Sequence, residues 1–226
     1  MKTIAGITPV CVSIVAIGLM LAGQSPAEED LYLSFFLGME DGSEASDGVD
    51  VIISIEEEGK ETEVFHKHWE DQKWSDEFIV DLREWGGKTI TLKIITDPGE
   101  ARNTGWDWIL IGDAKVIFDG EVIYDIGQAV AENKQENSML IDGEKKERPG
   151  LGFGACCQIV DFMAGGEKKP KTIYQHPAWD GAVGNTIARF KIELPFAGFE
   201  AVEADGKLAT VWGQLKAYYS VRSYFP

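Results

Sequence analysis

Basic residues are scarce in this sequence, and cysteines are scarcer. The chain of 226 residues has 21 Lys and Arg against 38 Asp and Glu, which gives a formal net charge of −17 at pH 7. Such a surface repels phosphate backbones, so we expect no nucleic-acid partner and favour neutral ligands or cations. There are three cysteines and no C-x-x-C spacing, so the sequence holds no metal or redox motif of that kind.

No catalytic motif is present either. The segment from His176 to Asp180 brings histidine, tryptophan and aspartate together, but no nucleophile stands in an activated setting beside them. We therefore expect a protein without enzymatic activity. A glycosidase remains a minor alternative, because the separation of two carboxylates in space decides that chemistry and the sequence does not give it.

One long apolar run lies at the N-terminus. Lys2 forms a short basic region, residues 4–23 are almost wholly apolar, and Ser25 and Ala27 supply small residues at the −3 and −1 positions of a cleavage site. This pattern predicts a signal peptide over residues 1–27, and hence an extracellular, cell-surface or periplasmic protein. If the run stays uncut, it is long enough to act as a membrane anchor.

Cleavage would remove Cys11 and leave Cys156 and Cys157, which are adjacent. In an oxidising compartment the two can close a vicinal disulfide ring. The alternative is a pair of thiols, one buried and one exposed.

Beyond residue 30 the sequence has little that indicates helix. Short runs rich in β-formers recur about every ten residues, with turn residues between them. They cover 31–37, 49–56, 61–69, 78–82, 89–96, 106–111, 115–118 and 121–126, and two more cover 173–176 and 188–194. This spacing predicts an all-β fold, an antiparallel sandwich or barrel.

Several short motifs add a family resemblance. They are Asp41-Gly42-Ser43, Ser46-Asp47-Gly48-Val49, Trp74, Val80-Asp81-Leu82, Gly87-Lys88-Thr89, Thr96-Asp97-Pro98-Gly99, Asn103-Thr104 and Asp107-Trp108. In this order and spacing the sequence resembles the galactose-binding-like β-sandwich family, most closely the novel putative carbohydrate-binding modules attached to glycosidases. The resemblance implies a jelly-roll sandwich that binds sugars or cell-surface glycans. The chain departs from it at Ile111, where such modules often carry tryptophan, and in lacking the first strands before Leu31.

The resemblance also bears on the division of the chain. Residues 28–126 are predicted to form the sandwich module, and residues 127–169 a linker and irregular region with a short polar helix over 128–136. Residues 170–226 either supply the missing strands to the first module or begin a truncated second repeat. We prefer the first alternative, because it leaves no edge strand unpaired.

A calcium site is one candidate. Asp41, Asp47 and Asp50 lie close together in an acidic, glycine-rich loop. Calcium takes six to eight oxygen ligands on flexible loops, and sandwiches of this family often hold a structural calcium. The alternative is that these residues simply form turns, with side chains that cap backbone amides.

The second candidate is a ligand site around Trp106, Asp107 and Arg102-Asn103. An indole can stack on a pyranose face, and a carboxylate can accept hydrogen bonds from hydroxyl groups. The alternative places both indoles of Trp106 and Trp108 in the core, with Asp107 bonded to the backbone or a nearby loop.

Two further aromatic residues and two histidines complete the set. Trp69 and Trp74 flank a polar turn and would form an exposed aromatic platform, or else anchor their strands in the core. His66 and His68 share a strand face and would form a metal site, or else are two exposed cross-strand histidines; no third ligand is identifiable. We therefore expect a secreted or surface β-sandwich that binds glycans without chemistry, with a structural or protein-interaction module as the alternative.

Overall fold

A computed structural model describes residues 30–141, 144–146, 156–179 and 182–196. The predicted signal segment, residues 1–27, lies outside the described residues, and so do residues 197–226. In the described part of the chain, no helix is both long and apolar enough to span a membrane.

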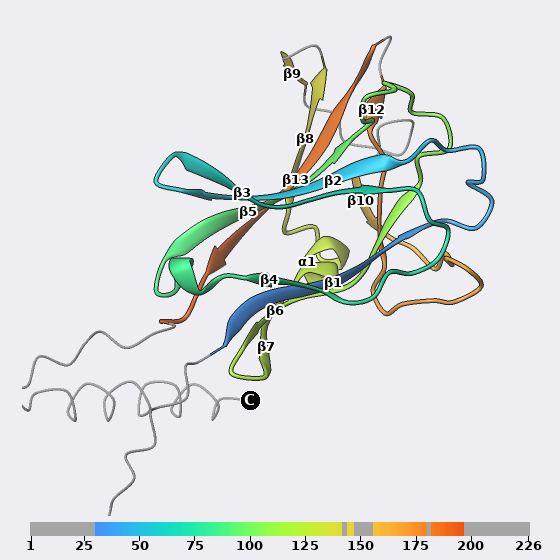
Figure 1. The fold of residues 1–226 in the computed structure, drawn as a ribbon. Helices are drawn as coiled ribbons and strands as arrows, with labels where there is room; N and C mark the ends of the chain where they lie inside the picture. Colours follow the sequence, from blue (N-terminus) through green and yellow to red (C-terminus); the bar gives the residue numbers. More distant parts are fainter. Residues whose placement is uncertain (1–29, 142–143, 147–155, 180–181, 197–226) are drawn as a thin grey trace, which may run out of the picture.

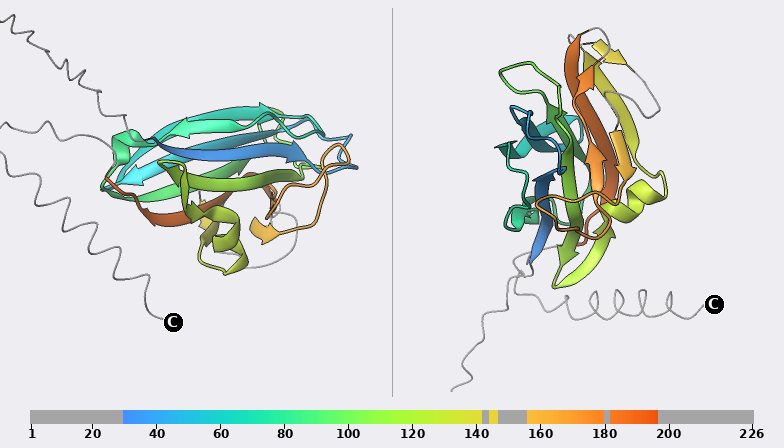
Figure 2. Two further views of the ribbon diagram at one scale, coloured as in Figure 1. Left: turned by 90° about the horizontal axis from the view of Figure 1, so that it is seen from below. Right: turned by 90° about the vertical axis from the view of Figure 1, so that its right-hand side faces the viewer.

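The described residues form two antiparallel sheets that pack face to face as a sandwich (Figures 1 and 2). The first sheet has the order β10-β11-β6-β1-β4, with β7 paired to β6. Its strands are β1 (Leu31–Met39), β4 (Phe78–Asp81), β6 (Ile109–Phe118), β7 (Glu121–Asp125), β10 (Cys156–Ile159) and β11 (Ile173–Gln175). The all-β prediction is therefore confirmed.

The second sheet has the order β3-β2-β5-β13-β8-β9, with β12 paired to β13. Its strands are β2 (Val49–Glu57), β3 (Lys60–Trp69), β5 (Thr89–Asp97), β8 (Glu136–Ile141), β9 (Glu144–Lys146), β12 (Ala178–Trp179) and β13 (Val183–Glu193). A 3₁₀ turn, η1 (Arg83–Trp85), connects β4 to β5.

Alternation along the strands produces the core. In β2, the side chains of Val49, Val51, Ile53 and Ile55 are all buried, because successive residues of a strand point to opposite faces. They join one apolar cluster with side chains of β1, β5, β6 and β13. Burial of this cluster between the sheets supplies the main stabilising free energy.

A β-bulge sets the register between β2 and β3. Near the turn Glu57 lies opposite Lys60, and the pairing shifts by one residue between Ile53 and Ser54. Beyond the shift, Asp50 lies opposite His68. A bulge adds one unpaired residue to one strand and thereby changes which side chains meet across the pair.

Residues 173–193 lie inside the same sandwich as residues 31–126. β13 is hydrogen-bonded to β5 on one side and to β8 on the other, and β11 pairs with β6. Phe190, Ile192 and Leu194 are buried in the apolar cluster that holds the side chains of β1.

Residues 127–169 were expected to be a linker, and in their described part this expectation is wrong. They contribute β8, β9 and β10, together with most of α1 (Ile126–Ala131). The predicted polar helix over 128–136 is thus shorter and earlier, and Ile126, Ala129 and Val130 of α1 are buried in the core. Asp125 caps its start by accepting a hydrogen bond from the backbone N–H of Gln128.

Candidate functional site

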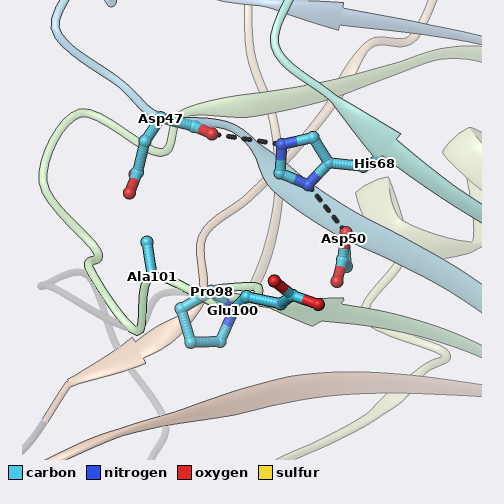
Figure 3. A pocket seen from close by; sticks show the side chains of 6 residues that line it. All are labelled: Asp47, Asp50, His68, Pro98, Glu100 and Ala101. Atoms are coloured by element: carbon cyan, nitrogen blue, oxygen red, sulfur yellow. Dashed lines mark hydrogen bonds and ion pairs between the residues drawn. The ribbon is translucent and has the colours of Figure 1, made fainter.

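A hollow of about 390 Å³ opens where the β2, β3 and β5 strands meet their loops. It is lined by Asp47, Asp50, His68, Pro98, Glu100 and Ala101 (Figure 3). In Figure 3, the first three of these residues lie on one side of the hollow and the other three on the opposite side. The volume falls in the range of small-molecule sites.

His68, on β3, forms hydrogen bonds with β2 and with the loop that precedes β2. Its Nδ1 lies 2.8 Å from Oδ1 of Asp50, and its Nε2 lies 3.1 Å from the backbone oxygen of Asp47. Burial alone would lower the pKa of His68, but the hydrogen bonds with Asp50 and Asp47 and the charges of Asp50 and Glu70 raise it above its ordinary value. These contacts favour the charged form of the imidazole more than in a free histidine.

Two glycines let the loops approach this imidazole. Gly48 has φ of +99°, and a Cβ placed there would lie 2.3 Å from Nε2 of His68. Gly99 has φ of +69°. Its backbone N–H donates a hydrogen bond of 2.8 Å to the Asp97 carboxylate. Glycine is required at Gly48 both by its left-handed backbone and by the close contact.

Asp107 lies beneath the loops, fully buried. Its Oδ1 accepts a hydrogen bond of 2.6 Å from Ser46 Oγ, and its Oδ2 is buried with no hydrogen-bond partner. Burial raises the pKa of Asp107 to about 7; the charge of Asp47 adds to the rise, while the Ser46 hydrogen bond and the charge of His68 oppose it. Because Asp107 is inaccessible, it positions the loop of residues 43–48 and does not face the hollow's solvent.

The strand predicted over 106–111 begins only at Ile109, so Trp106 and Trp108 belong to the preceding loop. Trp106 has φ of +67°, and the Trp108 N–H donates to the Trp106 carbonyl, which produces a tight turn. The Trp106 side chain is 48% exposed, and its ring centroid lies 5.0 Å from that of Trp108. Trp106 is thus exposed and Trp108 half-buried, in the loop that also holds Glu100 and Ala101, and neither indole lines the hollow.

The exposed residues Arg102 and Asn103 lie in the same loop and help to fix it. The Arg102 guanidinium donates to the Val183 carbonyl at 3.2 Å, and Asn103 Nδ2 donates to Asp47 Oδ1 at 3.2 Å. Asn103 thus ties the loop after β5 to the loop before β2, on opposite sides of the hollow.

Trp69 and Trp74 are placed differently. Trp69 packs edge-to-face on Phe78, with 6.3 Å between the ring centroids, and donates its indole N–H to the Asp71 carbonyl. Trp74 lies over Gly38, donating to the Glu167 carbonyl at 2.9 Å. Both indoles anchor their segments against the sandwich, and the structure does not bring them to the hollow.

The three aspartates proposed for calcium contact different partners. Both carboxylate oxygens of Asp41 accept backbone N–H groups, from Gly165 at 2.7 Å and Gly166 at 3.0 Å. Asp50 faces histidines, and Asp47 accepts from Asn103. Among the residues that the structure describes, no three His, Cys, Asp or Glu side chains are grouped to hold a metal ion, and the calcium site stays a prediction.

His68 and Pro98 are lining residues that the sequence did not single out as glycan contacts, whereas Glu100 and Ala101 belong to the polar loop that it favours. Glu100 lies in the loop that holds Arg102 and Asn103, so the polar character of this loop is a usable signal. His68 carries no comparable signal, because its meeting with Asp50 depends on the bulge in β3.

Comparisons with known proteins give limited similarity. No family model matches the chain, and no solved structure matches it. A segment of 79 residues, 32% of this chain, is 35% identical to an uncharacterized protein of Archaeoglobus fulgidus. The match covers 20% of that relative, so this chain spans about a fifth of its length.

Proposed function

We propose that this protein binds a neutral glycan, without chemical change, in the hollow lined by Asp47, Asp50, His68 and Glu100. The observation that carries the proposal is the composition of this lining, which is rich in hydrogen-bond acceptors yet also holds the apolar surfaces of Pro98 and Ala101. Carboxylates accept hydrogen bonds from sugar hydroxyls, and the apolar surfaces suit the C–H faces of the ring.

The surrounding features support the same class of ligand. The exposed Trp106 indole offers a flat apolar face on the adjoining loop. A net charge of −17 disfavours anionic ligands and leaves neutral sugars as the better match. The proposal includes a secreted or cell-surface location, for which the N-terminal segment is the support.

The site is also held in place before any ligand arrives. The Asn103–Asp47 hydrogen bond and the Asp97 turn fix the two loops around it, and the His68–Asp50 pair joins strands β3 and β2. Fixed polar groups lose less conformational entropy on binding, so affinity does not depend on folding of the loops.

The test begins with a glycan array that identifies a neutral ligand, followed by titration calorimetry. We expect Glu100→Gln to weaken binding about 10-fold, because a hydrogen bond to a charged group is worth roughly 1.5–3 kcal/mol. Trp106→Ala should weaken it by a similar factor, since the stacking face is lost.

Glu121→Gln is the matched control, because Glu121 is exposed on β7 and outside the hollow. Its affinity should equal that of the wild type. Retention of no neutral glycan, or equal affinity in the Glu100→Gln and control variants, contradicts the proposal. Release of reducing sugar by the wild type would instead indicate a glycosidase, and selective capture of a protein ligand would indicate an interaction module.

A further inference from the structure

Cys156 and Cys157 are consecutive residues of β10, and a disulfide joins them. The alternative of two free thiols, one buried and one exposed, is therefore not what the structure has, and both side chains are half-buried. A disulfide stabilises mainly by closing a loop in the unfolded chain, and the effect grows with the length of that loop. A bond between adjacent residues closes almost no loop, so stabilisation of the fold does not account for it.

Each sulfur lies beside a side-chain amide oxygen. Cys156 Sγ lies 3.8 Å from Oδ1 of Asn137, and Cys157 Sγ lies 3.4 Å from Oε1 of Gln175. A disulfide sulfur has no proton to donate, so these oxygens receive nothing from the ring. After reduction, each S–H would find an acceptor already in place.

These two amides belong to different sheets. Asn137 lies on β8 and Gln175 on β11, while β10 itself also contacts β8 and β13. Gln175 is fully buried and donates to the carbonyls of Ile94 and Thr186, both in the second sheet. The Gln175 amide is thus held by the second sheet, whereas the Asn137 amide donates to the backbone carbonyl of Cys156 at 3.0 Å.

We propose that Cys156 and Cys157 form a reducible site that exchanges with dithiols and, once reduced, binds trivalent arsenicals as a vicinal dithiol. A thiolate of the reductant attacks one sulfur and releases the other cysteine as a thiol. The second thiol of the reductant then closes its own disulfide and frees the first cysteine, so two electrons and two protons pass to the protein. An organic arsenoxide next condenses with both thiols, forms two As–S bonds and releases one water.

This site lies apart from the hollow and is independent of glycan binding. The full chain is treated with dithiothreitol without denaturant, then freed of reductant and alkylated with iodoacetamide. We expect the peptide that carries Cys156 and Cys157 to gain two alkyl groups after reduction and none before. Phenylarsine oxide added before alkylation should bind this pair once per chain and block both groups.

Two further measurements separate a redox site from a structural bond. The circular dichroism spectrum should be unchanged on reduction, and the melting temperature should move by less than about 5 °C, because little loop entropy is involved. Cys157→Ser should lose stable arsenical binding, whereas the control Cys11→Ala should retain it.

Alkylation of both cysteines before reduction would overturn the proposal, because it would mean free thiols. Failure of dithiothreitol to open the bond in the folded protein would also overturn it, as would unfolding on reduction.

Discussion

Asp107 has unfavourable surroundings for a carboxylate. It is fully buried, one of its carboxyl oxygens has no partner, and its pKa is raised to about 7. A buried carboxylate with an unmatched oxygen is costly, whereas the protonated acid avoids burying a charge. The loop that carries Asp47 is hydrogen-bonded to this group through Ser46, so protonation at Asp107 bears directly on the order of the hollow.

The contribution of Asp107 to stability should therefore fall as the pH rises from about 4 to about 7. Burial lowers the pKa of His176, so its contribution changes with the opposite sign and is common to the wild type and the Asp107→Asn variant. The folded pKa of Asp107 lies above the unfolded value, so the folded state holds more protons across this window and loses relative stability as they leave. Asp107→Asn should flatten this slope and remove a penalty of up to about 4 kcal/mol above pH 7. Urea unfolding of the wild type and the variant at several pH values measures this difference in unfolding free energy.

His68 needs a separate control in that experiment. Its pKa is also raised in the folded protein, so its contribution is complete below its unfolded pKa and is lost as the pH rises through the folded one. Both groups thus change stability in the same direction. In a His68→Gln background, Asp107→Asn should still reduce the pH dependence of the unfolding free energy. If it does not, this pH dependence comes from His68 and not from Asp107.

At the scale of elements, the β2–β3 hairpin shows what the sequence could and could not predict. Alternation correctly places Val49, Val51, Ile53 and Ile55 toward the core, because period-two burial is a local property. The bulge between Ile53 and Ser54 is not visible in that pattern, and without it Asp50 would lie opposite Lys67 instead of His68. The pairing that builds half of the hollow was therefore beyond reach from the sequence.

The loop before β6 is a second feature that the sequence did not predict correctly. A strand over 106–111 was expected from its apolar and aromatic residues, but the left-handed backbone of Trp106 ends that pattern. The turn exposes Trp106 and buries Asp107, so tertiary contacts decide an arrangement that β propensity alone does not.

Gly48 offers a test of the loop that precedes β2. Gly48→Ala should destabilise the protein by more than about 2 kcal/mol and displace His68, because alanine is strained at this φ and its Cβ meets the imidazole. Gly42→Ala is the matched control, with φ of +103° and no atom within 4 Å of the added Cβ. Equal losses of unfolding free energy in the two variants would show that the His68 contact is unimportant.

For the whole molecule, the arrangement depends on β13. This strand lies between β5 and β8 near the middle of its sheet, and its Phe190 is fully buried in the cluster shared with β1. The strand patterns around residues 173–194 were detectable from the sequence. Their neighbours in the sheets were not, because strand order depends on contacts between distant segments.

Phe190→Ala should reduce the free energy of unfolding by about 3–5 kcal/mol, since it removes a large side chain from a packed core and leaves a cavity. Lys191→Ala, at the next and exposed position, should change it by less than about 0.5 kcal/mol. Chemical denaturation of both variants checks this. If both variants lost similarly little unfolding free energy, β13 would be peripheral to the cooperative fold.

The proposed function places a neutral glycan in the acidic hollow. The most direct test is a titration of the ¹⁵N-labelled protein with the best array ligand, followed by amide chemical shifts in NMR spectra. Saturable shifts should be concentrated at residues 47–50, 68 and 99–101, with the Glu100→Gln variant requiring about 10-fold more ligand. Saturable shifts confined to another face of the sandwich, or no shifts with any neutral glycan, would contradict it.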